Sequence, residues 1–190
     1  MKQQKHRILI LGASGFLGNS IYKELSSFYK TFGTYHTPKT EFENNNHFFE
    51  YNFEEDDIVE LLSALKPTII ISALRGTFPS QLMAHRHVYQ YLKLQEKSKI
   101  IFLSSANVFD AYSKYPSYET DTTLSNSIYG HFKIRVEQQL LTLPKRQLAI
   151  IRLPMVFGTQ SPRVYEIKLL HKVNEPIELF PNLVMNISTD

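Results

Sequence analysis

The 190-residue sequence contains no cysteine. This absence excludes disulfide bonds, thiolate metal sites and cysteine nucleophiles. Long apolar runs are also missing, and none approaches the roughly 18 residues that a membrane-spanning helix needs. The basic start, Lys2 to Arg7, precedes apolar residues as in a secretion signal, but that run breaks at a glycine after Leu11 and no small-residue cleavage site follows. We therefore expect a cytoplasmic protein without a membrane span.

Charge is scattered along the chain rather than gathered in runs. The formal net charge is +3, yet no long basic stretch is present. This distribution argues against nucleic acid as a partner and is compatible with a phosphorylated small molecule. With 43% hydrophobic and 21% charged residues, the chain is expected to fold around a sizeable core.

The stretch ILILGASGFLGNS, residues 8–20, has the pattern of a buried strand, a tight turn and a helix start. Gly12 allows a sharp turn, Gly15 allows the backbone to approach a phosphate pair, and Gly18 allows the helix to pack close to the strand. The open N–H groups and the positive end of the helix dipole would face the anion. This arrangement predicts dinucleotide binding, and the alternative is a glycine-rich turn with only a connecting role.

The second predicted strand covers Thr31 to His36, and the residues at its end determine which dinucleotide is expected. An acid about 20 positions after the glycines would bind the ribose hydroxyls of NAD. His36, Thr37 and Lys39 occupy that region instead, and the nearest acid, Glu41, comes after a proline. Positive and hydroxyl groups suit a 2′-phosphate, so NADP is the expected cofactor and NAD the alternative. The competing interpretation is that Lys39 is a solvated loop lysine.

Strands and helices alternate along the chain, which is typical of a parallel sheet covered on both faces. Helices are expected over 16–30, 54–65, 81–97, 124–143 and 164–173, and further strands over 47–52, 68–74, 99–105 and 147–153. Such sheets bind ligands beyond the carboxyl ends of their strands.

A histidine pair inside the helix expected over 81–97 raises the question of a metal. His85 and His87 flank Arg86. Side chains this close along a helix point in different directions, and no third ligand is evident. We expect no metal site.

A Tyr-x-x-x-Lys motif lies at Tyr129 and Lys133. Four residues apart on a helix, these side chains share one face, so the ammonium can lie close to the phenol. A nearby positive charge lowers the pKa of a phenol from its usual value near 10, and Tyr129 would then act as acid or base near neutral pH. Ser105, at the end of the strand expected over 99–105, would hydrogen-bond a substrate carbonyl.

Taken together, GASGFLG at 12–18, Ser105 and YGHFK at 129–133 resemble the extended, nucleotide-sugar-modifying branch of the short-chain dehydrogenase/reductase superfamily. Within it, FLSSANVFD, YPSYETD and the position of Tyr129 are most similar to the dTDP-4-dehydrorhamnose reductases. IIRLPMVFG, residues 150–158, is similar to the strand and loop that follow. The resemblance implies an α/β Rossmann-type fold, with a doubly wound parallel sheet, helices on both faces and a truncated substrate lobe. It also implies an oxidoreductase that passes a hydride between a nicotinamide and a nucleotide-activated keto-sugar.

The resemblance assigns roles to individual residues. Ser105 would orient the carbonyl, Tyr129 would transfer the proton, and Lys133 would bind the nicotinamide ribose and lower the tyrosine pKa. Together with His36 and Lys39, the expected cofactor contacts are Gly12, Ser14, Gly15, Phe16, Leu17, Gly18, Asn52, Phe53, Ala73, Leu74 and Lys133. Asn52 stands where the family usually has an acid.

Three features depart from the family pattern. Phe132 replaces a small residue, and its bulk would reshape the pocket. Arg75 and Gly76 stand where an alanine-rich segment is common. The family's substrate lobe continues past the equivalent of the last residues of this chain, so we expect a dinucleotide-binding domain over 1–153 and the start of an incomplete substrate lobe over 154–190.

Two alternatives to a keto-sugar reductase stay open. One is a nucleotide-sugar epimerase or dehydratase, although the extra acids that dehydratases need near the tyrosine are not obvious. The other is a non-catalytic NADP-binding regulatory subunit, for which the same branch offers a precedent. The expected partner is a small-molecule nucleotide-sugar, and the resemblance adds a homodimer paired through long helices.

Overall fold

The computed structural model describes residues 6–37, 40–112, 116–158, 160–177 and 186–188. The chain divides into two compact units, Met1–Arg152 and Leu153–Asp190. In the described residues, no helix combines the length and the apolar character needed to cross a bilayer.

Six strands form one parallel sheet in the order β3-β2-β1-β4-β5-β6. The strands are β1 (Arg7–Leu11), β2 (Lys30–Tyr35), β3 (Phe48–Glu50), β4 (Ile69–Ser72), β5 (Lys99–Ser105) and β6 (Leu148–Leu153). Ile8 of β1 lies opposite both Thr31 of β2 and Ile69 of β4. The chain winds outward from this central strand in both directions, so the carboxyl ends of β1 and β4 mark the switch point at which such sheets bind ligands.

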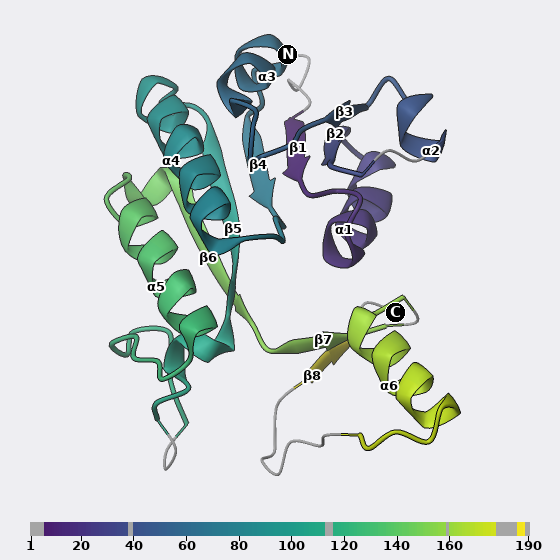
Figure 1. Ribbon diagram of the computed structural model, residues 1–190. Helices are drawn as coiled ribbons and strands as arrows, with labels where there is room; N and C mark the ends of the chain where they lie inside the picture. The colour runs from purple at the N-terminus through teal and green to yellow at the C-terminus, as the bar shows by residue number, and fades with distance from the viewer. Residues whose placement is uncertain (1–5, 38–39, 113–115, 159, 178–185, 189–190) are drawn as a thin grey trace. The chain divides into compact units, whose positions relative to one another are not determined.

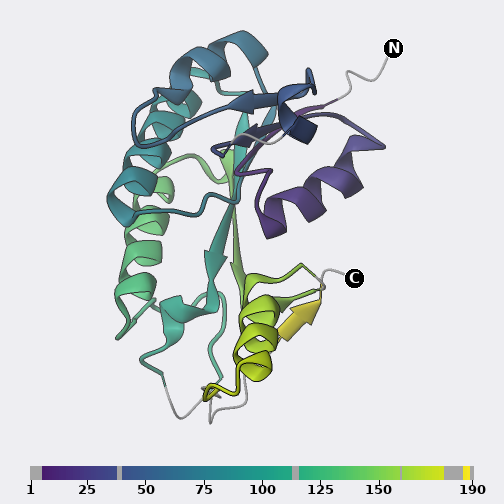
Figure 2. The ribbon, with the colours of Figure 1, turned by 45° about the vertical axis from the view of Figure 1, so that its right-hand side comes forward.

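Helices cover both faces of this sheet, which confirms the predicted fold class. The helices of the first unit are α1 (Phe16–Ser26), α2 (Thr40–Glu43), α3 (Ile58–Leu65), α4 (Phe78–Leu94) and α5 (Ile128–Leu140), with two 3₁₀ turns, η1 (Ala106–Phe109) and η2 (Lys145–Gln147). Figures 1 and 2 show α3, α4 and α5 side by side on one face and α1 on the other. Parallel strands joined by right-handed crossovers place their helices in this way.

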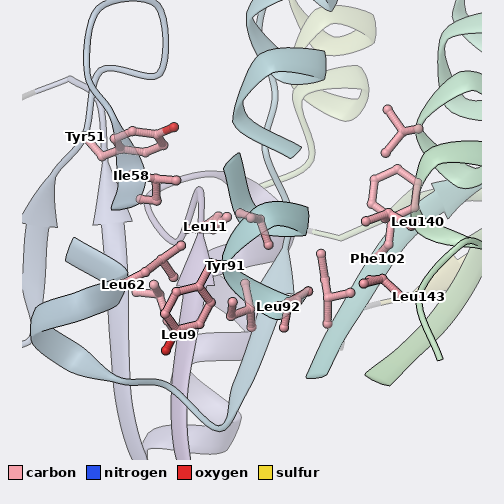
Figure 3. Packing of buried hydrophobic residues seen from close by; sticks show 14 of the residues in the cluster. Leu9, Leu11, Tyr51, Ile58, Leu62, Tyr91, Leu92, Phe102, Leu140 and Leu143 are labelled. Carbon is pink, nitrogen blue, oxygen red and sulfur yellow. The ribbon is translucent and has the colours of Figure 1, made fainter. Parts of the chain in front are cut away.

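The main core lies between the sheet and the layer formed by α3, α4 and α5. Leu9 and Leu11 of β1 are fully buried, and Phe102 of β5 is 1% exposed. Figure 3 shows these side chains with those of Ile58, Leu62, Leu92 and Leu140 from the three helices. Because both faces of a parallel strand are covered, its residues form a continuous apolar run, which is why the sequence pattern located the strands.

Capping residues set the helix boundaries that periodicity alone predicted less well. Asp57 accepts a hydrogen bond from the Val59 amide at 2.9 Å and starts α3, which was expected from residue 54. Ser127 caps α5 in the same way, and this helix begins at 128 rather than 124. An oxygen side chain that satisfies a free amide defines a helix start. The four-residue helix α2 was not predicted from the sequence.

The second unit contains β7 (Met155–Phe157), α6 (Pro162–Lys172) and β8 (Asn186–Ser188). β7 and β8 pair in parallel, with Met155 opposite Asn186. The helix predicted over 164–173 corresponds to α6, which starts two residues earlier because Pro162 is accommodated in its first turn. The three-residue strand β7 was not predicted.

Candidate functional site

The glycine turn between β1 and α1 has the tight geometry that its spacing predicted. Gly12 has φ of 80°, a conformation that favours glycine, and its carbonyl accepts a hydrogen bond from the Gly15 amide at 3.0 Å. A Cβ atom on Gly18 would lie 2.2 Å from the Gly12 carbonyl oxygen. The neighbouring strand supports the turn, because Thr34 accepts a hydrogen bond from the Gly12 amide at 2.8 Å through its hydroxyl.

The amino terminus of α1 keeps its backbone donors available. Its N-cap residue is the exposed Gly15, which offers no side-chain cap, and the first turn carries no acid. By contrast, Asp57 and Ser127 cap α3 and α5. Unpaired N–H groups and the positive end of a helix dipole bind anions. The Ser14 and Gly15 amides already donate to the carbonyls of Thr34 and Gly12, so the first turn of α1, which starts with Phe16 and Leu17, is the part that fits the diphosphate of a dinucleotide.

The residues expected at the adenine end gather after β2 and β3. His36 is exposed, and its ring centre lies 6.1 Å from that of Phe53. Phe53 also packs against Gly76, where a Cβ atom would lie 2.3 Å from the phenyl ring. Asn52 uses its side-chain oxygen locally, as acceptor of the Glu54 amide at 3.1 Å. Lys39 lies outside the described residues.

The end of β4 lies directly beside the glycine turn. The Ala73 amide donates a hydrogen bond to the Leu11 carbonyl at 2.9 Å. On the other side of Ala73, its carbonyl oxygen is so close to Gly12 that a Cβ atom there would approach it to 2.8 Å. Ala73 and Leu74 thus lie at the switch point of the sheet, next to the turn.

The three predicted catalytic side chains come together at the carboxyl end of β5. Ser105 is the last residue of β5, and its hydroxyl donates a hydrogen bond to the Asn107 side-chain oxygen at 2.9 Å. Tyr129 lies beside Ser105, in the first turn of α5. Lys133 follows one turn later, with Nζ 5.6 Å from the centre of the Tyr129 ring. This Nζ donates a hydrogen bond to the Leu103 carbonyl of β5 at 3.0 Å.

The electrostatics of the tyrosine differ from the prediction. Burial raises the pKa of Tyr129 above its ordinary value of 10, and neither the Ser105 side chain nor the positive charge of Arg75 offsets it. The expected lowering of this pKa does not occur in the chain by itself, and the Lys133 ammonium donates to the Leu103 carbonyl. Burial also lowers the pKa of Lys133 to about 8, against the opposing charge of Glu137.

Asp110, which the sequence analysis did not single out, holds the tyrosine helix in place. Its carboxylate accepts hydrogen bonds from the Asn126 amide at 2.6 Å and the Ser127 hydroxyl at 2.5 Å. Ser127 in turn accepts the Gly130 amide at 3.0 Å, so Asp110 fixes the start of α5 two residues before Tyr129. The only sequence signal for it was its position in the FLSSANVFD segment.

Phe132, whose bulk was expected to reshape the pocket, lies in the core beside Tyr129, with ring centres 6.4 Å apart. Its side chain is buried and stacks on Phe78, with ring centres 4.6 Å apart and planes 8° from parallel. The ring belongs to the core between α4 and α5. A bulky residue beside Lys133 is accommodated because it points into this core.

His85 and His87 have separate structural partners. The Nε2 atom of His85 lies 2.8 Å from the Ser72 hydroxyl, and its Nδ1 atom lies 2.5 Å from the Gln81 carbonyl. Burial lowers the pKa of His85 to about 4, so the ring is neutral. His87 lies 3.2 Å from Asp57. Within the part of the chain that the structure describes, no group of three or more acids and histidines is placed to hold a metal ion.

Comparison with known proteins gives consistent matches over most of the chain. The sequence model of the NAD dependent epimerase/dehydratase family matches residues 8–181. A dTDP-4-dehydrorhamnose reductase from Aggregatibacter actinomycetemcomitans is 30% identical over 164 residues, which cover 80% of this chain and 52% of that protein. Methionine adenosyltransferase 2 subunit beta from Danio rerio is 25% identical over 164 residues, covering 80% and 48% respectively. The chain therefore spans about half the length of these two relatives.

A solved structure shows the same fold. The Bordetella bronchiseptica enzyme WbmG, crystallised in complex with NAD, superposes with a TM-score of 0.78 at 14% sequence identity. The match covers 98% of this chain and 66% of the WbmG chain. At this identity the likeness concerns the fold alone.

Proposed function

The chain belongs to the NAD-dependent epimerase/dehydratase family, and from this membership we propose that it is an NADP-dependent oxidoreductase of a nucleotide-activated keto-sugar. In this proposal the chain is similar to the dTDP-4-dehydrorhamnose reductases, and NAD is the alternative cofactor. The observation that carries the proposal is the convergence of Ser105, Tyr129 and Lys133 at the end of β5. The glycine turn at the carboxyl end of β1 lies on the same edge of the same sheet.

Each of the three side chains has a distinct task in this reaction. The bound nicotinamide supplies or accepts the hydride. Ser105 hydrogen-bonds the substrate carbonyl and holds it in line with Tyr129, which gives its phenolic proton to the oxygen. Lys133 holds the nicotinamide ribose with its ammonium. The dinucleotide-binding domain, residues 1–153, would hold the cofactor, and residues 154–190 would contribute to the substrate lobe.

The protonation state of Tyr129 is compatible with the proposed reduction. Because burial raises its pKa, the phenol keeps its proton at neutral pH in the free chain. A protonated phenol can donate to a carbonyl oxygen, which is the step that reduction needs.

A regulatory subunit is the second candidate function. The observation in its favour is the similarity to a subunit of methionine adenosyltransferase 2, which extends over the same share of this chain as the similarity to the reductase. In this case the chain would bind NADP and a partner protein without turning over a sugar. Assembly into a homodimer and a cytoplasmic location are parts of the proposal under either function.

A fluorescence titration of the purified chain with NADPH and NADH in parallel is the first test. We expect both to bind and NADPH to bind more tightly. Lys39→Asp should weaken NADPH more than NADH, while Lys97→Asp, the same charge change at an exposed lysine before β5, should leave the ratio as in the wild type. An unchanged ratio in Lys39→Asp would remove the basis for NADP, and binding of neither nucleotide would overturn the dinucleotide site.

Turnover distinguishes the two candidates. With NADPH bound, oxidation of the cofactor on addition of dTDP-activated 4-keto-sugars, followed by absorbance, is expected for the reductase. Cofactor binding without turnover on keto-sugar nucleotides, combined with a stable complex with a methionine adenosyltransferase catalytic subunit, would favour the regulatory subunit.

A further inference from the structure

Glu137 is a buried acid one helical turn beyond Lys133 on α5. Only 2% of its side chain is exposed. Its carboxylate accepts hydrogen bonds from the Ser104 hydroxyl at 2.5 Å and from Nη2 of Arg152 at 2.8 Å. The Nε atom of Arg152 also contacts both carboxylate oxygens, at 3.2 and 3.3 Å. A two-pronged contact of this kind is the strong geometry for an arginine and a carboxylate.

The pair joins the segments that build the catalytic trio. Ser104 immediately precedes Ser105 on β5, and Arg152 stands near the end of β6. Arg152 extends the connection, because its Nη1 atom donates to the Glu119 carbonyl at 2.9 Å and its guanidinium lies 4.9 Å from the centre of the Phe109 ring. The ends of two strands, the tyrosine helix and the segment after Ser105 are thus tied to one carboxylate.

Lys133 and Arg152 are the two cations next to the Glu137 carboxylate. On α4, the buried His85 faces Lys133 in its neutral form. On α5 itself, Tyr129 keeps its proton, and from the loop after β4 Arg75 adds a positive charge near that phenol. The acid next to Lys133 is Glu137, which is buried four residues later on the same face of α5. The Lys133 ammonium and the Glu137 carboxylate hydrogen-bond adjacent residues of β5, Leu103 and Ser104. A buried ammonium without a counter-ion loses its proton.

We propose that Glu137 is a positioning residue of the Ser105, Tyr129 and Lys133 site, whose carboxylate serves as a counter-ion shared by Lys133 and Arg152 and keeps the Lys133 ammonium charged at neutral pH. The proposal rests on the proposed function only for the use of that charge, which is to hold the cofactor. The charge state itself can be measured without any ligand.

NMR of the full chain with ¹³Cε-labelled lysine measures the protonation of Lys133 directly. The signal is assigned by its absence in Lys133→Arg, and its midpoint is followed from pH 6 to pH 10. In Glu137→Gln we expect the midpoint to fall by about one pH unit, which is a tenfold lower ratio of ammonium to amine at a given pH. Glu60→Gln, the same change at an exposed position on α3, should leave the midpoint as in the wild type.

The direction of the change separates this role from a purely structural one. Loss of packing around α5 would expose Lys133 to water and raise its midpoint toward the ordinary value of 10.5. An unchanged or raised midpoint in folded Glu137→Gln would overturn the proposal. If glutamine at 137 prevents folding, Glu137→Asp retracts the charge by one methylene, and a smaller fall is expected there, with an unchanged midpoint again counting against the counter-ion role.

Cofactor affinity gives the functional readout. NADPH binding by the wild type should weaken as the pH rises through about 8, where Lys133 loses its proton. In Glu137→Gln this weakening should begin about one pH unit lower. If the NMR midpoint falls and the affinity profile does not follow it, the counter-ion role of Glu137 stands and the assigned use of Lys133 is wrong.

Discussion

Replacing Lys133 with methionine should make the protein more stable at neutral pH while it weakens cofactor binding. Lys133 is 6% exposed, and burial lowers its pKa from 10.5 to about 8. One pH unit corresponds to about 1.4 kcal/mol, so holding the ammonium inside the folded chain costs roughly 3 kcal/mol at pH 7. Methionine has a similar length and no charge.

Part of this gain is offset by lost contacts. The hydrogen bond from Lys133 to the Leu103 carbonyl disappears, which costs about 1 kcal/mol. The expected net gain in the free energy of unfolding at pH 7 is therefore about 2 kcal/mol. Such a gain would mean that the charge of Lys133 serves a function and not the stability of the fold.

The pH dependence has a definite sign. The unfolded chain binds the Lys133 proton more tightly than the folded chain, so the penalty is fully present below about pH 8 and vanishes as the pH rises toward 10.5. The advantage of Lys133→Met should therefore shrink to less than about 1 kcal/mol at pH 9.5. Urea denaturation at pH 7 and pH 9.5 measures this difference, with Lys97→Met as the exposed control. A variant less stable than the wild type at pH 7, or a gain independent of pH, would refute the reasoning.

Three further changes test other parts of the site. Gly18→Ala puts a Cβ atom 2.2 Å from the Gly12 carbonyl oxygen and should lower the free energy of unfolding by about 1–3 kcal/mol in urea, with weaker NADPH binding; unchanged stability would mean that the turn can relax. Tyr129→Phe should abolish turnover and leave NADPH affinity intact, and wild-type turnover would exclude it as the proton donor. The pKa of Asp110 is lowered below its ordinary 3.8, since hydrogen bonds from groups such as Ser127 outweigh its burial. Its carboxylate thus stabilises the fold above that pH. Asp110→Ala should lower the melting temperature most at neutral pH and by less below pH 3.8.

Local patterns in the sequence predicted most of the architecture. The strand expected over 99–105 is β5 with the same bounds, because a strand buried on both faces is a continuous apolar run. The spacing of the glycines predicted the turn at Gly12, because such a turn depends only on residues a few positions apart. Periodicity was less reliable at helix ends: Phe28 continued the apolar pattern of α1, yet it lies beyond the end of that helix and is 66% exposed.

The sequence by itself thus determined the order of the elements, the parallel sheet, the glycine turn and the pairing of Tyr129 with Lys133 on one helix face. Only the tertiary structure decided that Phe132 points into the core, that the Tyr129 phenol keeps its proton and that Glu137 meets Arg152. The physical reason is the distance along the sequence over which each property is determined. Backbone conformation depends on residues a few positions apart, whereas burial, and the pKa shifts that follow from it, depend on which distant segments come together.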